Sequence, residues 1–247
     1  MIDTHCHIFK EYYNNIDDII NKACQNGVDK MIVNGTNLEN NKEILILAEK
    51  YDSIYIALGF QPEDIDNNTR DNYSIITDNI DKIVAIGEIG LDYYNGPQDK
   101  EKQIKIFEEQ LALAEKYNKP VIIHTRNAHK DTIKSLSKYP NVKGIIHCFS
   151  EGLNEAKEYI SLGFYLGIGG IVTFKNSDLS KVLEHIDLSH IVLETDSPYL
   201  SPVPLRGKVN KPSNLIYIAQ KISEIKGISA DEVSKITTNN ANQIFDF

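Results

Sequence analysis

Residues that can bind metal ions stand at the ends of several short apolar runs in this sequence. Six residues occupy such positions: His5, His7, Glu88, His124, His147 and Asp196. Histidine and carboxylate side chains suit divalent ions such as Zn²⁺ and Mn²⁺, and carboxylate-rich sites also accept Mg²⁺. Six ligands are too many for one four-coordinate ion and suffice for two ions that share a carboxylate. The sequence therefore predicts a centre that binds two divalent metal ions.

The spacing of these residues indicates how many strands separate them. The steps from His7 to Glu88, His124, His147 and Asp196 are 81, 36, 23 and 49 residues. One strand-plus-helix unit averages about 27 residues over this span. The steps therefore correspond to three, one, one and two units. This spacing predicts eight strands, with all six ligands at the carboxyl ends of strands. Barrel enzymes carry their active sites at these ends.

The elements needed to position these residues are visible in the hydrophobic pattern. Short β-rich runs predict strands at 2–7, 30–34, 54–58, 83–88, 121–124, 144–147, 164–168 and 191–194. Apolar residues at helical spacing predict helices near 16–23, 104–114, 179–186 and 215–225. Ser229 and Glu232 form a capping box that predicts one more helix, shorter than the helix before it.

Alternation of strands and helices predicts βαβ units and a parallel sheet. A doubly wound sheet would have a Gly-rich turn after its first strand, whereas this chain continues there as His7-Ile8-Phe9. No linker or low-complexity segment interrupts the alternation. We therefore expect an α/β fold, a single (β/α)₈ TIM barrel over residues 1–247, with the metal site at the carboxyl ends of its strands.

Composition limits the class of protein. The 247 residues have a formal net charge of −9, and hydrophobic residues make up 41%, as in ordinary globular proteins. No stretch approaches the roughly 18 apolar residues of a membrane helix. The first apolar run starts at Ile2, which leaves no room for the parts of a signal peptide, so we expect none. We expect a cytoplasmic protein that contacts no membrane. The acidic balance disfavours a broad basic surface for nucleic acid but is compatible with a local anion site around metal ions.

The other reactive side chains are expected to play no catalytic part. His5 and His7 lie two apart in one strand and point toward the barrel axis, so Cys6 between them points toward the helices. The three cysteines, at 6, 24 and 148, are too few and too scattered for a disulfide framework. His129, His185 and His190 lie in helical or connecting sequence and are expected at the surface. The chain has no Gly-x-Ser-x-Gly elbow, so serine hydrolase chemistry has no support.

Several stretches around the predicted ligands resemble one known family. They are Asp3-Thr4-His5-Cys6-His7, Ile86-Gly87-Glu88-Ile89-Gly90-Leu91-Asp92-Tyr93, Val121-Ile122-Ile123-His124-Thr125-Arg126, Ile146-His147-Cys148-Phe149-Ser150, Leu193-Glu194-Thr195-Asp196-Ser197-Pro198-Tyr199-Leu200 and the segment from Pro202 to Pro212. In these stretches the chain resembles the TatD family of metal-dependent deoxyribonucleases, which belongs to the amidohydrolase-like barrels. The matches follow in order from residue 2 to about 212 and so cover nearly the whole chain.

The resemblance implies how the ligands divide between the ions. His5, His7 and Asp196 would hold one ion, His124 and His147 would hold the other, and Glu88 would bridge both. It also implies the activity, which is hydrolysis of phosphodiester bonds in DNA, commonly from a 3′ end, with Mg²⁺ or another divalent ion. DNA ends or another phosphodiester would then be the substrate, and no obligate protein partner is inferred.

Three further residues are expected to contact the substrate. The resemblance implies that Arg206 and Asn210 contact its phosphate, and Arg206 suits this role because a guanidinium donates two parallel hydrogen bonds. Arg126, just beyond His124, is a second candidate for phosphate, although it could equally begin the next helix as a solvated residue. Two positions depart from the family's pattern: Gln61 stands where the family usually has His, and Glu151 where it usually has Gly.

The expected mechanism is two-metal hydrolysis. Glu88 would bridge the ions, and Asp196 is the candidate general base because it would face the attacking water. Glu194 points inward with Asp196 and is expected to orient a ligand histidine. Two alternatives stay open: a metal-dependent hydrolase of a small amide, ester or lactone, and a metal site that catalyses nothing. The segment Arg206-Gly207-Lys208 favours the phosphodiester, because an uncharged substrate would not need it.

Overall fold

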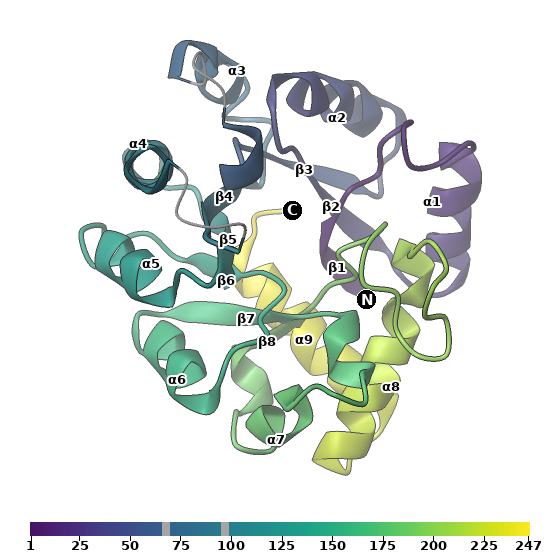
Figure 1. Ribbon diagram of the computed structural model, residues 1–247. Helices are drawn as coiled ribbons and strands as arrows, with labels where there is room; N and C mark the ends of the chain where they lie inside the picture. Colours follow the sequence, from purple (N-terminus) through teal and green to yellow (C-terminus); the bar gives the residue numbers. More distant parts are fainter. Residues whose placement is uncertain (66–69, 95–98) are drawn as a thin grey trace.

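The computed structural model describes residues 1–65, 70–94 and 99–247. In these residues eight strands pair side by side, all parallel and in chain order. They are β1 (Ile2–Cys6), β2 (Lys30–Asn34), β3 (Ile54–Leu58), β4 (Ala85–Asp92), β5 (Val121–Arg126), β6 (Gly144–Ile146), β7 (Phe164–Ile168) and β8 (Ile191–Leu193). Figure 1 shows the strands grouped at the centre, with helices around them.

Helices follow the strands around the ring. The α-helices are α1 (Ile16–Gln25), α2 (Leu38–Lys50), α3 (Ser74–Thr77), α4 (Lys100–Tyr117), α5 (His129–Leu136), α6 (Leu153–Ser161), α7 (Leu179–Glu184), α8 (Leu215–Lys226) and α9 (Ala230–Ile244). Short 3₁₀ helices are η1 (Pro62–Asp64), η2 (Arg70–Asn72), η3 (Gly170–Thr173), η4 (Leu188–His190) and η5 (Pro212–Asn214). Caps fix several of the helix starts: the Asn15 side chain accepts a hydrogen bond from the amide of Asp18 at the start of α1.

The ring of strands closes between β8 and β1. The Asp196 amide donates to the His5 carbonyl (3.0 Å), and the His7 amide donates to the Ser197 carbonyl (2.7 Å). Cys6 and Ser197 form a parallel bridge at the same place. The fold is therefore the expected (β/α)₈ TIM barrel, and the bonds that close it lie beside three of the predicted ligands.

Inside the barrel, apolar side chains fill the end opposite these ligands. Strands around the ring contribute a buried cluster with the end of α9: Ile2, Ile32, Ala57, Val84, Ala85, Ile122, Ile145, Val192, Ala241 and Phe245. In Figure 1, α9 crosses the ring of strands. This packing closes one end of the barrel and leaves the carboxyl ends of the strands for polar side chains.

Two of the differences from the sequence prediction concern β4 and α9. Strand β4 runs from Ala85 to Asp92 instead of ending at Glu88, because its pairing with β5 continues past an irregularity between Ile86 and Ile89. Helix α9 has 15 residues and α8 has 12, so the last helix is the longer of the two. Its buried face includes Thr237 and Asn240, whose polarity conceals the helical apolar stripe in the sequence.

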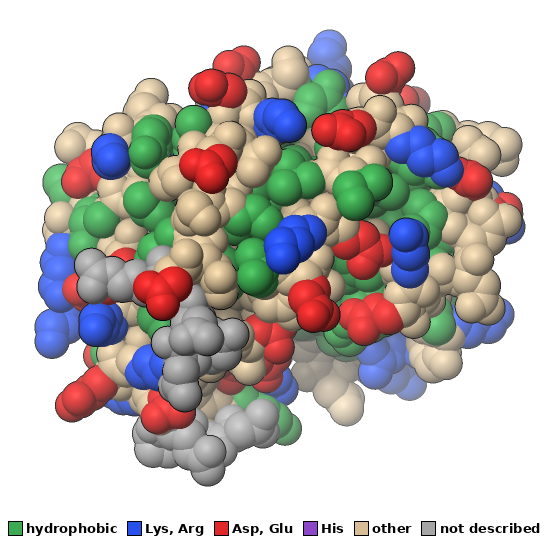
Figure 2. Space-filling model, turned by 90° about the horizontal axis from the view of Figure 1, so that it is seen from above, with side chains coloured by type: hydrophobic (Ala, Val, Ile, Leu, Met, Phe, Trp, Pro, Cys, Tyr) green, Lys and Arg blue, Asp and Glu red, His purple; other side chains and the backbone are tan. Residues whose placement is uncertain are grey.

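The outer surface carries charges of both signs. Figure 2 shows acidic and basic side chains interspersed over one face, with apolar side chains between them. In the part of the chain that the structure describes, no helix combines the length and apolar character needed to cross a membrane.

Candidate metal centre

The six side chains predicted to bind metal meet at the carboxyl ends of the strands. They lie at the base of a pocket of about 440 Å³, whose lining includes His7, Glu88, His124, His147 and Asp196. His5 lies beneath these residues and has no exposed surface. The structure thus brings together ligands that are up to 191 positions apart in the chain.

Glu88 lies between two pairs of histidines and presents one carboxylate oxygen to each pair. Its Oε2 is 3.5 Å from Nε2 of His5 and 3.4 Å from Nε2 of His7. Its Oε1 is 3.0 Å from Nδ1 of His124 and 3.1 Å from Nε2 of His147. A carboxylate placed in this way can serve two cations at once.

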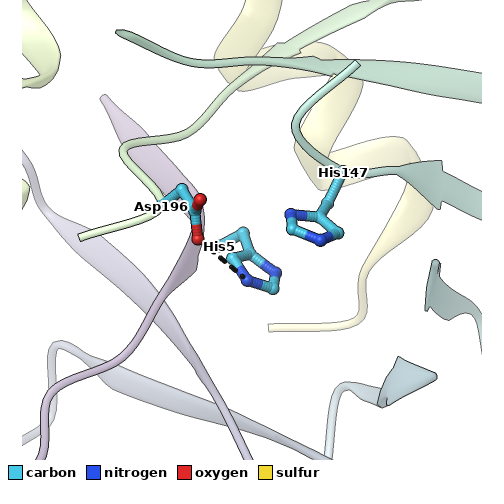
Figure 3. A group of neighbouring side chains, drawn as sticks. All are labelled: His5, His147 and Asp196. Carbon is cyan, nitrogen blue, oxygen red and sulfur yellow. Dashed lines mark ion pairs between the residues drawn. The ribbon is translucent and has the colours of Figure 1, made fainter. Parts of the chain in front are cut away.

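Asp196 faces the same pair of histidines as Oε2 of Glu88. Its Oδ1 is 3.6 Å from Nε2 of His5 and 3.7 Å from Nε2 of His7. Figure 3 shows His5 between Asp196 and His147, and the rings of His5 and His147 are stacked with centroids 3.9 Å apart. Burial raises the pKa of Asp196 to about 7. Asp196 therefore completes the ligand set on the His5 side while remaining part of the pocket wall.

Acceptors hold the outer nitrogens of two ligand histidines, His7 and His124. Nδ1 of His7 donates to the Asn34 carbonyl (3.0 Å), and Nε2 of His124 donates to Oδ2 of Asp92 (2.9 Å). Nδ1 of His147 lies 3.6 Å from Oε1 of Glu194. A histidine that carries its proton on the outer nitrogen presents a lone pair on the inner one. The surrounding protein thus fixes tautomers of His7 and His124 that suit metal binding.

The donor set fits divalent cations. Inner nitrogens approach each other closely, with Nε2 of His5 and His7 3.1 Å apart and Nδ1 of His124 3.1 Å from Nε2 of His147. The donor atoms form three groups, and within each group all the atoms lie within 4.8 Å of one another. The groups are His5, His7 and Glu88; Glu88, His124 and His147; and His5, His147 and Asp196. Lone pairs and carboxylates that converge in this way repel one another unless a cation or protons lie between them.

Burial and the charges of neighbouring ligands shift the pKa values of the centre. Burial lowers the pKa of His5 and of His7. Burial would raise the pKa of Glu88, but the neighbouring His147 and His124 outweigh it and hold the pKa well below its usual range. Burial would lower the pKa of His124, but hydrogen bonds to Asp92 and Glu88 outweigh burial and raise this pKa to about 9. A bound cation would replace these protons, because metal and proton compete for the same lone pairs.

Backbone irregularities aim the ligands into the pocket. The pairing register shifts between Asp3 and Cys6 in β1 and between Ile86 and Ile89 in β4, next to His5 and Glu88 respectively. Such bulges re-aim side chains at barrel rims and beside active sites. Gly90 follows the second irregularity with φ of 146°, and a Cβ there would lie 1.9 Å from the His124 carbonyl oxygen. Only glycine allows this approach of β4 to β5.

A buried carboxylate fixes the segment that carries Asp196. Asp3 accepts hydrogen bonds from the amide of Thr195 (2.9 Å) and from its hydroxyl (2.6 Å). Burial raises the pKa of Asp3 to about 8. Gly167 leaves room for the neighbouring Glu194, since a Cβ at 167 would lie 2.1 Å from Oε2 of Glu194. These contacts position the residues on both sides of Thr195.

Comparison with known proteins agrees with this centre. The profile of the family described as "TatD related DNase" matches residues 2–246. The chain belongs to the TatD family. It is 38% identical to the uncharacterized metal-dependent hydrolase YabD of Bacillus subtilis, covering 99% of this chain and 98% of the relative. It is 33% identical to the uncharacterized metal-dependent hydrolase YcfH of Escherichia coli, covering 99% and 95%.

Solved structures of TatD-family proteins share the fold. The crystal structure of YjjV, a TatD homologue from Escherichia coli, superimposes with a TM-score of 0.94 at 32% identity, covering 100% of this chain and 98% of that one. A TatD-family hydrolase from Entamoeba histolytica superimposes with a TM-score of 0.87 at 25% identity, covering 99% and 97%. The chain is thus a metal-dependent hydrolase of the TatD family, with the (β/α)₈ barrel of its relatives.

The two arginines expected to contact phosphate differ in their distance from the metal pocket: Arg126 lines the pocket and Arg206 does not. Arg126 lines the metal pocket, and its guanidinium lies 3.5 Å from the centroid of the Tyr94 ring. Arg206 is exposed and lies 3.9 Å from the centroid of the Phe174 ring, outside the described lining of the pocket. Phe174 itself lines a neighbouring groove. Arg126 is therefore the arginine of this group that borders the metal ligands.

Asn210 has a structural role instead of the predicted contact with substrate. It has no exposed surface, and its Nδ2 donates to the carbonyls of Thr195 and Tyr199 at 2.8 Å each. Its Oδ1 accepts hydrogen bonds from the amide of Lys211 and from Nδ2 of Asn214, both at 2.9 Å. All its polar atoms are thus used to fold the loop after β8, and none is available for a phosphate.

The two residues that depart from the sequence pattern of the TatD family, Gln61 and Glu151, both lie near the pocket. Gln61 lines it, and its Nε2 donates to Oδ2 of Asp64 (2.9 Å). Glu151 lines the neighbouring groove, where its Oε2 is 3.3 Å from Nδ1 of His129. His129 was expected at the surface without a role; it is partly exposed and joins Glu151 to the carboxylate of Glu158 (2.8 Å).

Sequence reasoning missed two groups that orient the TatD ligands. Asn34 ends the second strand and acts through its main-chain carbonyl, which no side-chain pattern reveals. Asp92 lies in one of the stretches that resemble the family, and in the structure it accepts a hydrogen bond from His124. The signal for Asp92 was its place four residues after Glu88 on a strand that lies beside the strand of His124. Burial raises the pKa of Cys6 and Cys148 well above the usual thiol range, so neither is poised to act as a thiolate.

Proposed function

We propose that this protein is a divalent-metal-dependent deoxyribonuclease that removes nucleotides from a 3′ end by two-metal hydrolysis. The observation that carries the proposal is the position of Glu88, whose two oxygens face separate pairs of histidines at the base of an open pocket. Membership of a family described as DNases supports a phosphodiester substrate. Structural metal sites are closed, so an open pocket above the ligands supports catalysis.

The ligands would hold two cations in two sets. His5, His7 and Asp196 would hold one, His124 and His147 the other, and Glu88 would bind both. Such a pair of ions, when bound, polarises a phosphoryl oxygen and lowers the pKa of a coordinated water.

The chain's own residues would then act on the substrate. Asp196 lies at the pocket wall beside the ligand histidines, so it would accept the proton of the attacking water as general base. Arg126 borders the same pocket and would hold a phosphate oxygen through charge-assisted hydrogen bonds. Outer partners such as Asp92 would keep the histidine lone pairs aimed inward throughout the reaction.

The surface favours a strand end over a duplex. Affinity for duplex DNA comes from many Lys and Arg contacts with phosphates, and this chain has a net charge of −9. Tyr199, which is 50% exposed, lines the pocket beside its ligands and offers an aromatic face to an unpaired base. A short single-stranded end is therefore the form of DNA that suits the pocket.

One observation favours a second candidate, hydrolysis of a small amide, ester or lactone by the same centre. Arg206, which an uncharged substrate would not need, lies outside the described lining of the metal pocket. The case for a phosphodiester in the pocket therefore rests on Arg126 and on the family. Barrels of this architecture support many hydrolytic reactions, so fold does not decide between the two.

The test is an assay of the purified protein on single-stranded DNA, double-stranded DNA, RNA and a panel of small esters and lactones. Each substrate is offered with Mg²⁺, Mn²⁺ or Zn²⁺ and again after chelation. We expect metal-dependent release of nucleotides from the 3′ end of single-stranded DNA and loss of this release after chelation. Hydrolysis of the small esters alone would support the second candidate, and full activity after extended dialysis against EDTA would refute both.

A further inference from the structure

A second groove opens beside the metal pocket. It has a volume of about 580 Å³ and lies between the start of α6 and the segment from η3 to α7. The groove and the metal pocket share three lining residues, Ser150, Ile171 and Leu200. A chain-like substrate held in the pocket would therefore have its next unit beside this groove.

One wall of the groove is an aromatic ring supported by a cation. Phe174 lines the groove and is partly exposed. The Arg206 guanidinium lies 3.9 Å from the centroid of this ring, and Arg206 is not among the described lining residues of the groove. Phe174 therefore contacts Arg206 and also lines the groove. An aromatic ring in such a position suits stacking with a nucleobase, since every base has a π face.

The groove also contains a carboxylate that is held in place. The Glu151 side chain is 21% exposed, while its Oε2 is buried 3.3 Å from Nδ1 of His129. His129 is in turn fixed by Oε2 of Glu158, 2.8 Å from its Nε2. Asp178 also lines the groove, but it is exposed and pairs with Lys181 (2.7 Å). Glu151 is therefore the anchored carboxylate of this groove.

The charge of Glu151 determines which part of a nucleotide can lie next to it. A carboxylate repels phosphate and accepts hydrogen bonds from amino and imino groups. Cytosine offers its N4 amino group, and carboxylates in proteins accept from it. Thymine presents the oxygen O4 at the position of that amino group, and its imino N3–H lies between two carbonyl oxygens that a carboxylate would repel. A ring for stacking and a carboxylate for hydrogen bonding together define a place for a base that carries an amino group.

We propose that this groove holds a nucleobase of the substrate strand next to the cleaved nucleotide, and that Glu151 selects bases with an exocyclic amino group. The proposal rests on the proposed nuclease function and adds base selectivity to it. Glu151 and Phe174 are the residues that carry it, the first by accepting a hydrogen bond and the second by stacking. Arg206 then acts through the Phe174 ring and not through a phosphate.

The experiment measures binding of fluorescein-labelled hexamers of oligo-dC and oligo-dT, which have equal length and charge, by fluorescence anisotropy in EDTA. We expect about tenfold tighter binding of oligo-dC, a typical discrimination for a carboxylate that pairs with a base. In Glu151→Gln the preference should largely disappear, because an amide also donates to the thymine oxygen. In Phe174→Ala both hexamers should bind about five- to hundredfold more weakly, with the preference kept, because stacking is tolerant of base identity.

The matched control is Asp178→Asn, which removes the other carboxylate of the groove lining, one that pairs with Lys181 and lies outside the Glu151–His129 contact. This variant should keep the preference for oligo-dC. Equal binding of the two hexamers by the unmodified protein, an unchanged preference in Glu151→Gln, or an equal loss in Asp178→Asn would overturn the proposal. Thermal unfolding of each variant checks that its fold is intact.

A parallel assay with Mg²⁺ or Mn²⁺ separates this proposal from the proposed function. Metal-dependent release of nucleotides without base preference in binding would overturn the groove assignment alone. Selective binding of oligo-dC, lost in Glu151→Gln, would support the groove assignment even if neither hexamer were hydrolysed, and that lack of hydrolysis would contradict the nuclease proposal.

Discussion

Replacement of Asp92 by Asn should weaken the binding of one of the two proposed metal ions and leave the binding of the other unchanged. Oδ2 of Asp92 accepts the proton on Nε2 of His124 (2.9 Å), while its Oδ1 accepts the amide of Tyr94 (2.8 Å). An Asn at 92 can keep the bond from Tyr94 and would then turn its NH₂ group toward Nε2 of His124. Two donors would face each other, and His124 would move its proton to Nδ1, the atom that faces Glu88.

The size of this effect follows from the partners of His124. Loss of a carboxylate that orients a ligand histidine weakens metal binding about 10- to 100-fold, which is about 1.4–2.7 kcal/mol. His124 is 20% exposed, so water can replace part of the lost interaction, and we expect about tenfold. His5 and His7 have no contact with Asp92 in the described structure, so the ion on their side should bind as before.

Calorimetric titration of the metal-free protein with Mn²⁺ resolves the two events. In Asp92→Asn one site should keep its affinity for Mn²⁺ and the other should lose affinity. Turnover by this variant should fall because the weakened site is less often occupied. The control is Asp64→Asn, which removes a carboxylate that contacts Gln61 at the pocket but none of the ligands. Equal weakening of both sites, or no weakening of either, would refute the role assigned to Asp92.

The other substitutions test the roles of single residues. Glu88→Ala should reduce the metal content per chain more than replacement of His5 alone, because Glu88 faces both histidine pairs; undiminished metal content by elemental analysis would show that it is no bridge. Asp196→Asn should keep the fold and lower turnover by about 10²–10⁴-fold, and a value within a few-fold of the unmodified enzyme would remove it as the base. Arg126→Ala should lower kcat/KM for DNA about 10- to 100-fold through lost charge-assisted hydrogen bonds. Arg206→Ala should lower it only about two- to fivefold, as loss of a cation–π contact does, and the reverse order would place the phosphate at Arg206.

The sequence was most informative where chemistry and periodicity coincide. The six ligands stand at the ends of five β-rich runs, and the intervals between these ends are close to multiples of one strand-plus-helix unit. Such a unit has few alternative folds, because parallel strands require a helical crossover of one hand. The sequence alone therefore predicts the eight strands and the common location of the ligands. Alternation also predicted that His5 and His7 face the same side and Cys6 does not, and their inner nitrogens are 3.1 Å apart.

Features that depend on register and on loops were beyond the sequence. Asp92 reaches His124 because β4 continues past an irregularity and pairs Gly90 with His124, and a bulge of this kind has no simple sequence signal. The family resemblance implied that Asn210 contacts phosphate, whereas the loop after β8 folds back and uses the side-chain amide of Asn210 for hydrogen bonds to main-chain carbonyls. Arg206 likewise packs on Phe174, a contact between segments 32 positions apart.

The number of metal ions needed for activity tests the central claim most directly. Protein stripped by chelation is titrated with Mn²⁺ at a concentration above both dissociation constants, and release of nucleotides from the 3′ end of single-stranded DNA is followed at each ratio of metal to chain. If two ions sharing Glu88 carry out the hydrolysis, activity should stay low through the first equivalent and rise to its maximum with the second. Full activity at one equivalent, or activity independent of Mn²⁺, would contradict the account.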